Sequence, residues 1–383
     1  MLPAPIQELI AISLIMRVYI PSPRYFITPR NTDWLYTVRM QELSRFCPGV
    51  EVYLQRAPLI DLLINCSYCC SILHHRLHLP IPEALRFGFR DTYLSTRDFR
   101  RSGCDLIFSN ERFPTRTPAP VVWQTGPTWT DLLLAQGVER ASIERQLEWK
   151  RACAAKSKLI VVLTRWGAER VSAMLGGFDE KLRVVPYFLP HVNFIERAKI
   201  AAKASEAVYR LAFVGRQARR KGLDLVIEAF ELLDTRFPGR FRLTIVSSLI
   251  DGPVDLPRKP NLELIRELPV AAVQELLGKA HFLLMPSRFE TFGWVYVEAM
   301  SRGAIAVAPQ APIQAELLAQ GRAGLLTEAA PGAIARSIGE ASTSPEIWLQ
   351  HALAGYDFAQ REFGPAAVAG KFQSVFEEAL AAR

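Results

Sequence analysis

Two loops in the second half of the chain carry side chains that could bind a phosphorylated ligand. The first begins at Gly215, directly after an apolar run, and a helix is predicted to begin near Gly222. Backbone N–H groups at a helix start, together with Arg and Lys, are typical of a diphosphate site. Taken alone, this pattern also fits a solvated basic loop. The four cations of the loop are Arg216, Arg219, Arg220 and Lys221.

The second loop, residues 286–293, offers a pair of carboxylates. Glu290 precedes a helix predicted to begin near Gly293, and Glu298 lies more than one turn inside that helix, so the two are not a surface i,i+4 pair. Gly293 allows close approach of a ligand to the backbone. Glu298 lies among apolar residues, where a carboxylate needs a donor such as a sugar hydroxyl. Alternatively, Glu290 caps the helix and Glu298 is solvated.

Each loop follows a strand of the same predicted sheet. Ligands of open α/β sheets bind beyond the carboxyl ends of the strands. A phosphate receptor and two carboxylates at one edge therefore predict a nucleotide-sugar site, which neither loop predicts alone.

Short β-branched runs alternate with helical periodicity along the chain, which predicts βαβ units and parallel sheets. Strands are expected in the first half at 14–20, 50–54, 105–109, 120–123, 158–163 and 181–185, with helices at 32–46 and 142–155. In the second half they are expected at 211–214, 242–246, 262–265, 281–285, 304–308 and 324–326.

The pattern divides the chain into four parts. Residues 1–190 form an N-terminal domain, in which 1–15 read as an extension outside the fold. A polar stretch after two prolines predicts a linker at 191–209. A second domain follows at 210–355, and 356–383 is expected as a C-terminal helix.

Composition limits the class of protein and its partners. The chain has 383 residues and a net charge of +8, and residues 1–200 carry the whole surplus, which favours an anionic partner or membrane surface there. Leu2–Met16 is too short for a span and lacks the basic start of a secretory signal. Six scattered cysteines suggest a cytoplasmic protein, and the irregular spacing of Cys66, Cys69 and Cys70 with nearby histidines argues against a metal site.

Together, the two loops resemble the retaining family 4 glycosyltransferases of GT-B fold. Residues 286–303 match the family's Pro-Ser-x-x-Glu-x-Phe-Gly…Glu-Ala-Met-x-x-Gly motif, and 213–222 match its Gly-Arg…Lys-Gly loop. The resemblance implies two Rossmann-like α/β domains that face each other across a cleft. It also implies that the C-terminal helix crosses back to the N-terminal domain.

The resemblance also implies roles for residues of both loops. Arg216 and Lys221 would hold the donor diphosphate, Glu290 would bind hydroxyls of the transferred sugar, and these three form the expected catalytic set. Glu298 would bind the ribose, and the base would lie near Arg266. The full donor-binding set is Gly215, Thr291, Phe292, Gly293, Glu298 and Arg266.

The N-terminal half departs from this family pattern. Residues 21–25 read Pro-Ser-Pro-Arg-Tyr where many members have a Gly-rich loop. Gln124 and Thr125 stand where many have a histidine, and they are candidates for the acceptor side. Residues 243–247 also lack the usual Gly-x-Gly ending.

The sequence therefore predicts a retaining transferase that moves a sugar from a nucleotide diphosphate to a hydroxyl of a glycan, lipid-linked or small-molecule acceptor. No metal or other cofactor and no nucleic acid is expected, and the basic half adds peripheral association with an anionic membrane surface as an option. Two alternatives stay open. One is a catalytically silent protein that binds nucleotide sugars, and the other is a glycoside hydrolase using Glu290 and Glu298 as acid and base.

Overall fold

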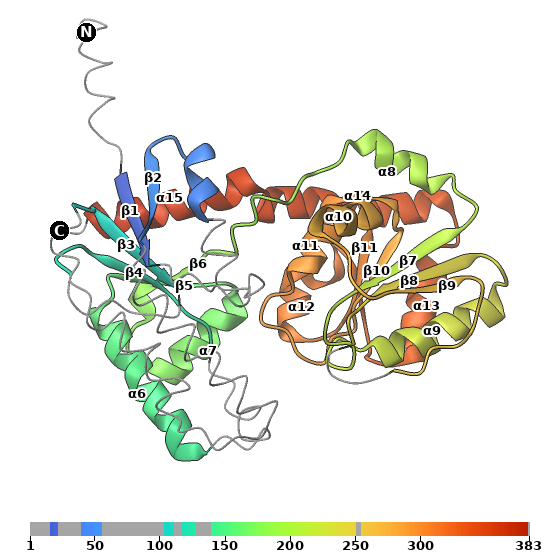
Figure 1. Cartoon of the computed structure of the whole chain (residues 1–383), viewed down its shortest axis with the longest axis horizontal. Helices are drawn as coiled ribbons and strands as arrows, with labels where there is room; N and C mark the ends of the chain where they lie inside the picture. Colours follow the sequence, from blue (N-terminus) through green and yellow to red (C-terminus); the bar gives the residue numbers. More distant parts are fainter. Residues whose placement is uncertain are drawn as a thin grey trace, which may run out of the picture. The chain divides into compact units, whose positions relative to one another are not determined.

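A computed structural model describes residues 16–21, 40–55, 103–110, 117–127, 139–249 and 254–381. The chain divides into two compact units, 1–190 with 365–383 and 191–364 (Figure 1). The expected extension at 1–15, most of the 21–25 loop and the cysteines at 66–70 lie outside the described residues.

The first unit contains a parallel six-stranded sheet in the order β2-β1-β3-β4-β5-β6. All six predicted strands are confirmed, each end within two residues. The strands are β1 Met16–Pro21, β2 Val50–Gln55, β3 Leu106–Asn110, β4 Val121–Gln124, β5 Leu159–Val162 and β6 Leu182–Val184. The described helices are η1 Gln41–Arg45, α6 Arg140–Lys156, α7 Arg165–Leu175, η3 Asp179–Lys181 and α15 Pro365–Ala381. Of the helix expected at 32–46, only the end is described, and η1 is a 3-10 helix.

Helices cover both faces of this first sheet. Ile107 of β3 belongs to a buried cluster with Cys153 of α6 and Val171 of α7. The next residue, Phe108, packs edge-on against Phe372 of α15, with ring centroids 5.4 Å apart. Successive side chains of a strand point to opposite faces, so α6 and α7 cover one face and α15 the other.

The expected C-terminal helix at 356–383 is two helices in the structure. The first, α14 (Pro345–Phe363), belongs to the second unit, and α15 belongs to the first. Gly364 between them is extended (φ −56°, ψ 140°). The ring of Pro365 disfavours helical backbone at the residue before it, which explains the break.

The second unit contains a parallel sheet in the order β12-β11-β10-β7-β8-β9. All six strands predicted here are confirmed. They are β7 Tyr209–Val214, β8 Phe241–Val246, β9 Leu262–Ile265, β10 Phe282–Leu284, β11 Ile305–Pro309 and β12 Leu325–Thr327. The helices are α8 Arg197–Ala204, α9 Leu223–Arg236, α10 Val270–Lys279, α11 Trp294–Ser301, α12 Pro312–Leu317, η4 Ala319–Gly321, α13 Pro331–Ala341 and α14. From β7 the strands are added outward as β8 and β9, and from β10 they are added outward on the other side as β11 and β12. The strand order therefore reverses between the neighbours β7 and β10, and we call this place the switch point of the sheet.

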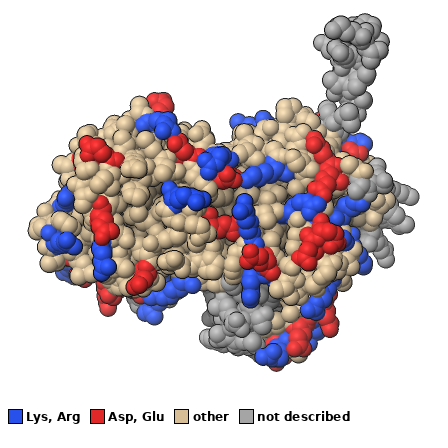
Figure 2. Space-filling view, turned by 180° about the vertical axis from the view of Figure 1, so that it is seen from behind, with Lys and Arg blue, Asp and Glu red and all other residues tan. Residues whose placement is uncertain are grey.

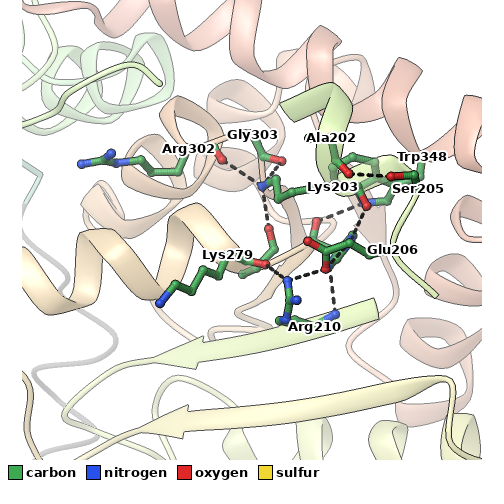
Figure 3. Close-up of polar contacts among 11 residues, drawn as sticks. Ala202, Lys203, Ser205, Glu206, Arg210, Lys279, Arg302, Gly303 and Trp348 are labelled. Carbon is green, nitrogen blue, oxygen red and sulfur yellow. Dashed lines mark hydrogen bonds and ion pairs between the residues drawn. The ribbon is translucent and has the colours of Figure 1, made fainter. Parts of the chain in front are cut away.

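The whole of the expected linker at 191–209 falls within the second unit and includes α8. We call residues 191–204 the strap, because they join α11 and the turn after it through contacts spread along the segment. The Ile195 N–H donates to the Ser301 carbonyl at 3.2 Å. Lys203 is buried, and its Nζ donates to the carbonyls of Ala280 (2.8 Å), Arg302 (3.0 Å) and Gly303 (2.9 Å) (Figure 3). One ammonium thus satisfies carbonyls at the ends of both α10 and α11, where helices leave acceptors unpaired.

His281, at the start of β10, lies buried next to this lysine. Its Nδ1 accepts from the N–H of Arg210 at 3.0 Å, and its Nε2 lies 3.0 Å from the Lys203 carbonyl. These partners fix the neutral tautomer with the proton on Nε2, since a proton on Nδ1 would face another donor. Burial accordingly lowers the pKa of His281 to about 4.

No helix of the described residues is long and apolar enough to cross a membrane. On the face that Figure 2 shows, Lys and Arg side chains are interspersed with Asp and Glu across the coloured residues. That face therefore presents no single basic patch to an anionic partner.

The buried His281 predicts acid sensitivity of the second unit. The unfolded chain takes up its proton near pH 6.5, and the folded chain does so only near pH 4. Stability should therefore fall as pH drops between these values, by about 3 kcal/mol in total. The free energy of unfolding in urea, determined at several pH values, measures this loss, and hydrogen exchange of the β10 amides assigns it to the second unit. His281→Gln should flatten the pH dependence, whereas His351→Gln, on α14, should not; equal slopes in all three proteins would contradict the assignment.

Candidate functional site

The two predicted loops lie side by side at the switch point of the second sheet, where the strand order reverses between β7 and β10. One loop follows β7, the other follows β10, and these parallel strands are hydrogen-bonded neighbours. Parallel neighbours end at the same edge, and a crevice opens where the connections diverge to opposite sides. The topology therefore places both candidate loops at the part of the sheet where this fold binds ligands.

Arginines from each loop fasten the two loops together. Arg220 donates to the Phe289 carbonyl at 2.6 Å, and the Arg288 N–H donates to the Arg220 carbonyl at 2.9 Å. Arg288 also forms a two-point contact with Asp224, at 2.8 and 2.5 Å. Paired guanidinium–carboxylate contacts fix geometry as well as charge, so the loops form one framework.

A buried ion pair joins the same loops at the site. Lys221 Nζ donates to Glu290 Oε1, which also accepts from the Ser287 hydroxyl at 3.0 Å. The side chains are 13% and 5% exposed. Burial lowers the pKa of Lys221, while the Glu290 charge raises it. The two side chains identified from sequence, 69 positions apart, are thus in direct contact.

Both helices that start at the site begin with glycine. Gly222 precedes α9 and Gly293 precedes α11, with φ of 78° and 87°, and neither start is capped by a side chain. A β-carbon at Gly222 would lie 2.3 Å from the Pro286 carbonyl oxygen of the other loop. Glycine is therefore required for the two backbones to approach, and uncapped helix starts favour an anion.

The remaining donor-side residues differ in what they offer a ligand. Arg216 is exposed and has no polar partner in the described part of the chain, and Thr291 is exposed as well. A β-carbon at Gly215 would lie 3.1 Å from Lys221 Cγ, so this glycine leaves room for the lysine. The Phe292 ring is buried against Phe363, which leaves only its backbone for a ligand.

Glu298, on α11, has a partner that the sequence did not predict. Its Oε1 lies 2.7 Å from Nε2 of His191, the first residue of the strap. The two side chains are 15% and 18% exposed. The solvated position considered for Glu298 is therefore wrong.

Three expected site residues belong to elements other than the two loops. Arg266 is exposed just after β9, two strands from β7 in the sheet. Gln124 and Thr125 belong to the first unit, at the end of β4, and both are buried. Thr125 Oγ1 accepts from Lys150 Nζ at 3.1 Å, whereas both amide atoms of Gln124 lack a hydrogen-bond partner among the described residues.

Sequence reasoning assigned no role to Ser287, Arg288 or His191. The first two stand inside the recognised motif, so the position of Glu290 two or three residues later could have drawn attention to them. His191 lies in the expected linker, more than a hundred residues from Glu298, and no spacing rule connects the two.

Gly222→Ala tests the close approach of the two loops. Gly239 provides a matched control, because its φ of 72° is similar but nothing lies within 4 Å of an added β-carbon. Gly239→Ala should lose about 1 kcal/mol of stability from the left-handed backbone alone. Gly222→Ala should lose about 3 kcal/mol, because the Pro286 carbonyl must also move. Urea unfolding midpoints of the two variants measure these losses of stability. Equal losses in Gly222→Ala and Gly239→Ala would show that the loops are not in close contact.

Comparison with known proteins agrees with these loops. Residues 208–343 match the family model described as glycosyl transferases group 1. The chain is similar to D-inositol 3-phosphate glycosyltransferase of Pseudarthrobacter chlorophenolicus, 28% identical over 211 residues, 52% of this chain and 50% of that protein. It is also similar to alpha-maltose-1-phosphate synthase of Mycolicibacterium smegmatis, 26% identical over 45% of this chain and 48% of that protein. The chain matches about half the length of these relatives.

Solved structures match almost the whole chain at low sequence identity. HepE of Anabaena, in complex with UDP and glucose, has a TM-score of 0.61 and 14% identity over 94% of this chain and 99% of its own. Sucrose-phosphate synthase of Thermosynechococcus elongatus has a TM-score of 0.61 and 15% identity over 96% and 100%. These likenesses confirm the expected GT-B fold with its two parallel sheets. Residues 208–343, most of the second unit, are thus similar to the group 1 glycosyltransferases.

Proposed function

We propose that this protein is a retaining glycosyltransferase that uses a nucleotide-diphosphate sugar as donor. The observation that carries the proposal is the Lys221–Glu290 pair at the switch point of the second sheet. A cation for a diphosphate and a carboxylate for sugar hydroxyls stand there together. Two uncapped helix starts at the same edge add positive potential.

Arg216 and Lys221 would stabilise the leaving group. As the bond from the anomeric carbon to the phosphate oxygen breaks, positive charge develops on the sugar and negative charge on the departing diphosphate. Fixed donors aimed at developing charge are often the largest catalytic contribution. Lys221 is already held by Glu290, while exposed Arg216 can move onto the phosphate.

Glu290 would orient the transferred sugar by accepting from its hydroxyls, and Glu298 would accept from the ribose. Retention follows if the acceptor oxygen attacks the face that the phosphate leaves. The acceptor's proton then passes to the departing phosphate oxygen, so the step balances without a protein nucleophile or a metal. Thr291, Gly293 and the Phe292 backbone would line the sugar and its phosphate.

UDP-glucose is the first donor to test. HepE is described in complex with UDP-glucose, and a trehalose-6-phosphate protein of E. coli with UDP-2-fluoro glucose. We propose that the base binds near Arg266, after β9. For the acceptor we propose only a hydroxyl group, carried by a glycan, a lipid-linked sugar or a small molecule.

A protein that binds nucleotide sugars without turnover is the second candidate, favoured by Gln124 in place of the family's histidine. A thermal-shift screen with UDP, ADP, GDP and their glucose conjugates tests binding, since a ligand raises apparent stability by mass action. Donor consumption tests turnover. Binding without transfer or donor hydrolysis would support the silent protein, and no binding at all would overturn the proposal.

A glycoside hydrolase fits the contacts less well. Its general acid must present a donating O–H, whereas Glu290 accepts from Lys221 and Ser287. A neutral glycoside also needs no cationic loop. Release of free sugar from a glycan without nucleotide would favour this alternative.

Lys221→Ala and Glu290→Gln should each lower transfer by roughly a hundredfold or more while the chain remains folded. The first removes the cation at the diphosphate, and the second removes the charge that accepts from sugar hydroxyls. Initial rates of donor consumption measure the effect, and circular dichroism checks folding. Lys221→Ala alone leaves the buried Glu290 carboxylate without its cation, which can destabilise the fold. The double variant Lys221→Ala/Glu290→Gln removes both charges, so it should fold and be as inactive as the single variants.

Lys259→Ala serves as the control for these variants. This lysine pairs with Asp234 at 2.7 Å in the same unit, away from the two loops. Its loss should leave the rate within about twofold. Wild-type turnover in Lys221→Ala and Glu290→Gln would count decisively against the proposed site.

Gln124→Met tests whether the amide of Gln124, which has no hydrogen-bond partner among the described residues, serves a ligand. Burying a polar group without partners costs about 1–3 kcal/mol, so an apolar side chain of similar shape should stabilise the fold. The same change should lower transfer, because the ligand loses its hydrogen bonds. Gln124→His, which restores hydrogen-bonding capacity, should retain more transfer than Gln124→Met. If the Gln124→Met variant is more stable than the wild-type chain and keeps full transfer activity, the amide of Gln124 has no role in ligand binding.

A further inference from the structure

We propose that His191 is a positioning residue for donor binding. It holds one oxygen of the Glu298 carboxylate and leaves the other to accept from the ribose hydroxyls of the nucleotide. This inference rests on the proposed function, because it assigns the ribose contact to Glu298. His191 lies outside both recognised motifs.

The contact between the two residues is short and well shielded. Nε2 of His191 and Oε1 of Glu298 are 2.7 Å apart, and both side chains are less than a fifth exposed. A carboxylate in such surroundings is costly without a donor. In the described part of the chain, Glu298 Oε2 has no protein partner, so one oxygen is held and one remains for a ligand.

The proton on the imidazole can be assigned from its two nitrogens. Nδ1 of His191 is buried and has no hydrogen-bond partner among the described residues. A proton on Nδ1 would therefore be a buried unpaired donor, whereas a lone pair there costs less. The proton between the ring and the carboxylate is therefore assigned to Nε2, which donates to Glu298.

The strap holds His191 in place along α11. Four residues after His191, the Ile195 N–H donates to Ser301, one turn beyond Glu298. Ile200 then packs so closely on Gly303 that a β-carbon there would lie 2.5 Å from Ile200 Cγ1. Together with the two bonds from Lys203 to the carbonyls of Arg302 and Gly303, these contacts join the strap to α11 between Glu298 and the turn that follows the helix. His191 is thus presented by a fixed backbone.

A positioning role predicts an effect confined to the ribose. The wild-type chain should bind UDP roughly tenfold more tightly than 2′,3′-dideoxy-UDP, equivalent to about 1.4 kcal/mol. His191→Ala should weaken UDP binding roughly tenfold and lose this preference, with unchanged affinity for the dideoxy nucleotide and for inorganic pyrophosphate. Calorimetric titration of the full chain with these three probes measures it. In transfer assays the donor KM should rise with little change in kcat.

Two variants separate positioning from a general loosening of the strap. His191→Gln can place an N–H near the position of Nε2, so it should recover most of the ribose preference. Tyr356→Phe removes the bond from the Tyr356 hydroxyl to the Ile195 carbonyl (2.8 Å) without touching Glu298, and it should keep the full preference.

The outcomes distinguish this inference from the proposed function. If the wild-type chain binds UDP with the ribose preference and His191→Ala keeps it, the role of His191 is refuted while the transferase proposal stands. Equal loss of affinity for UDP and pyrophosphate in His191→Ala would also refute it. If the wild-type chain binds no nucleoside diphosphate, tested with UDP, ADP and GDP, both proposals fail together.

Discussion

The buried ion pair between Lys221 and Glu290 is the constraint on which the rest of the site depends. Such a pair adds little stability, because removing both charges from water offsets most of their attraction. Its retention at the switch point is understood if a ligand uses both groups. The surrounding contacts, from Arg220 to Phe289 and from Arg288 to Asp224, hold the two loops so that the pair can form.

The two helices that start at this edge of the sheet lack the stabilisation that a capping side chain would provide. A Ser or Asp before α9 or α11 would cap the exposed N–H groups, yet both helices begin after glycine. At Gly222 the space is closed by the Pro286 carbonyl, and at Gly293 an added β-carbon would lie 2.6 Å from the Tyr296 ring. The loops therefore approach closely, and the helix starts lack capping side chains that would compete with an anion.

The fold could be predicted from sequence wherever local pattern decides it. All twelve strands of the described residues were predicted, because buried parallel strands are short apolar runs bounded by turn residues. That the two loops lie at one edge of the sheet could be predicted, because each loop directly follows such a strand, whereas the direct contact between Lys221 and Glu290 is seen only in the structure. The His191–Glu298 contact could not be predicted, since it joins an irregular segment to the middle of a helix through tertiary packing alone. The break at Gly364 was missed although Pro365 signals it, because helical periodicity continues on both sides.

The strap gives α11 a role beyond that of a covering helix. At its start, Gly293 belongs to the loop that carries Glu290, and at its end Lys203 binds the carbonyls of Arg302 and Gly303. A site is held accurately when rigid elements present its side chains and a second set of contacts fixes those elements. Residues 191–204 supply that second set. Under the proposed function, substitutions in the strap should therefore alter donor binding from positions that do not themselves contact the donor.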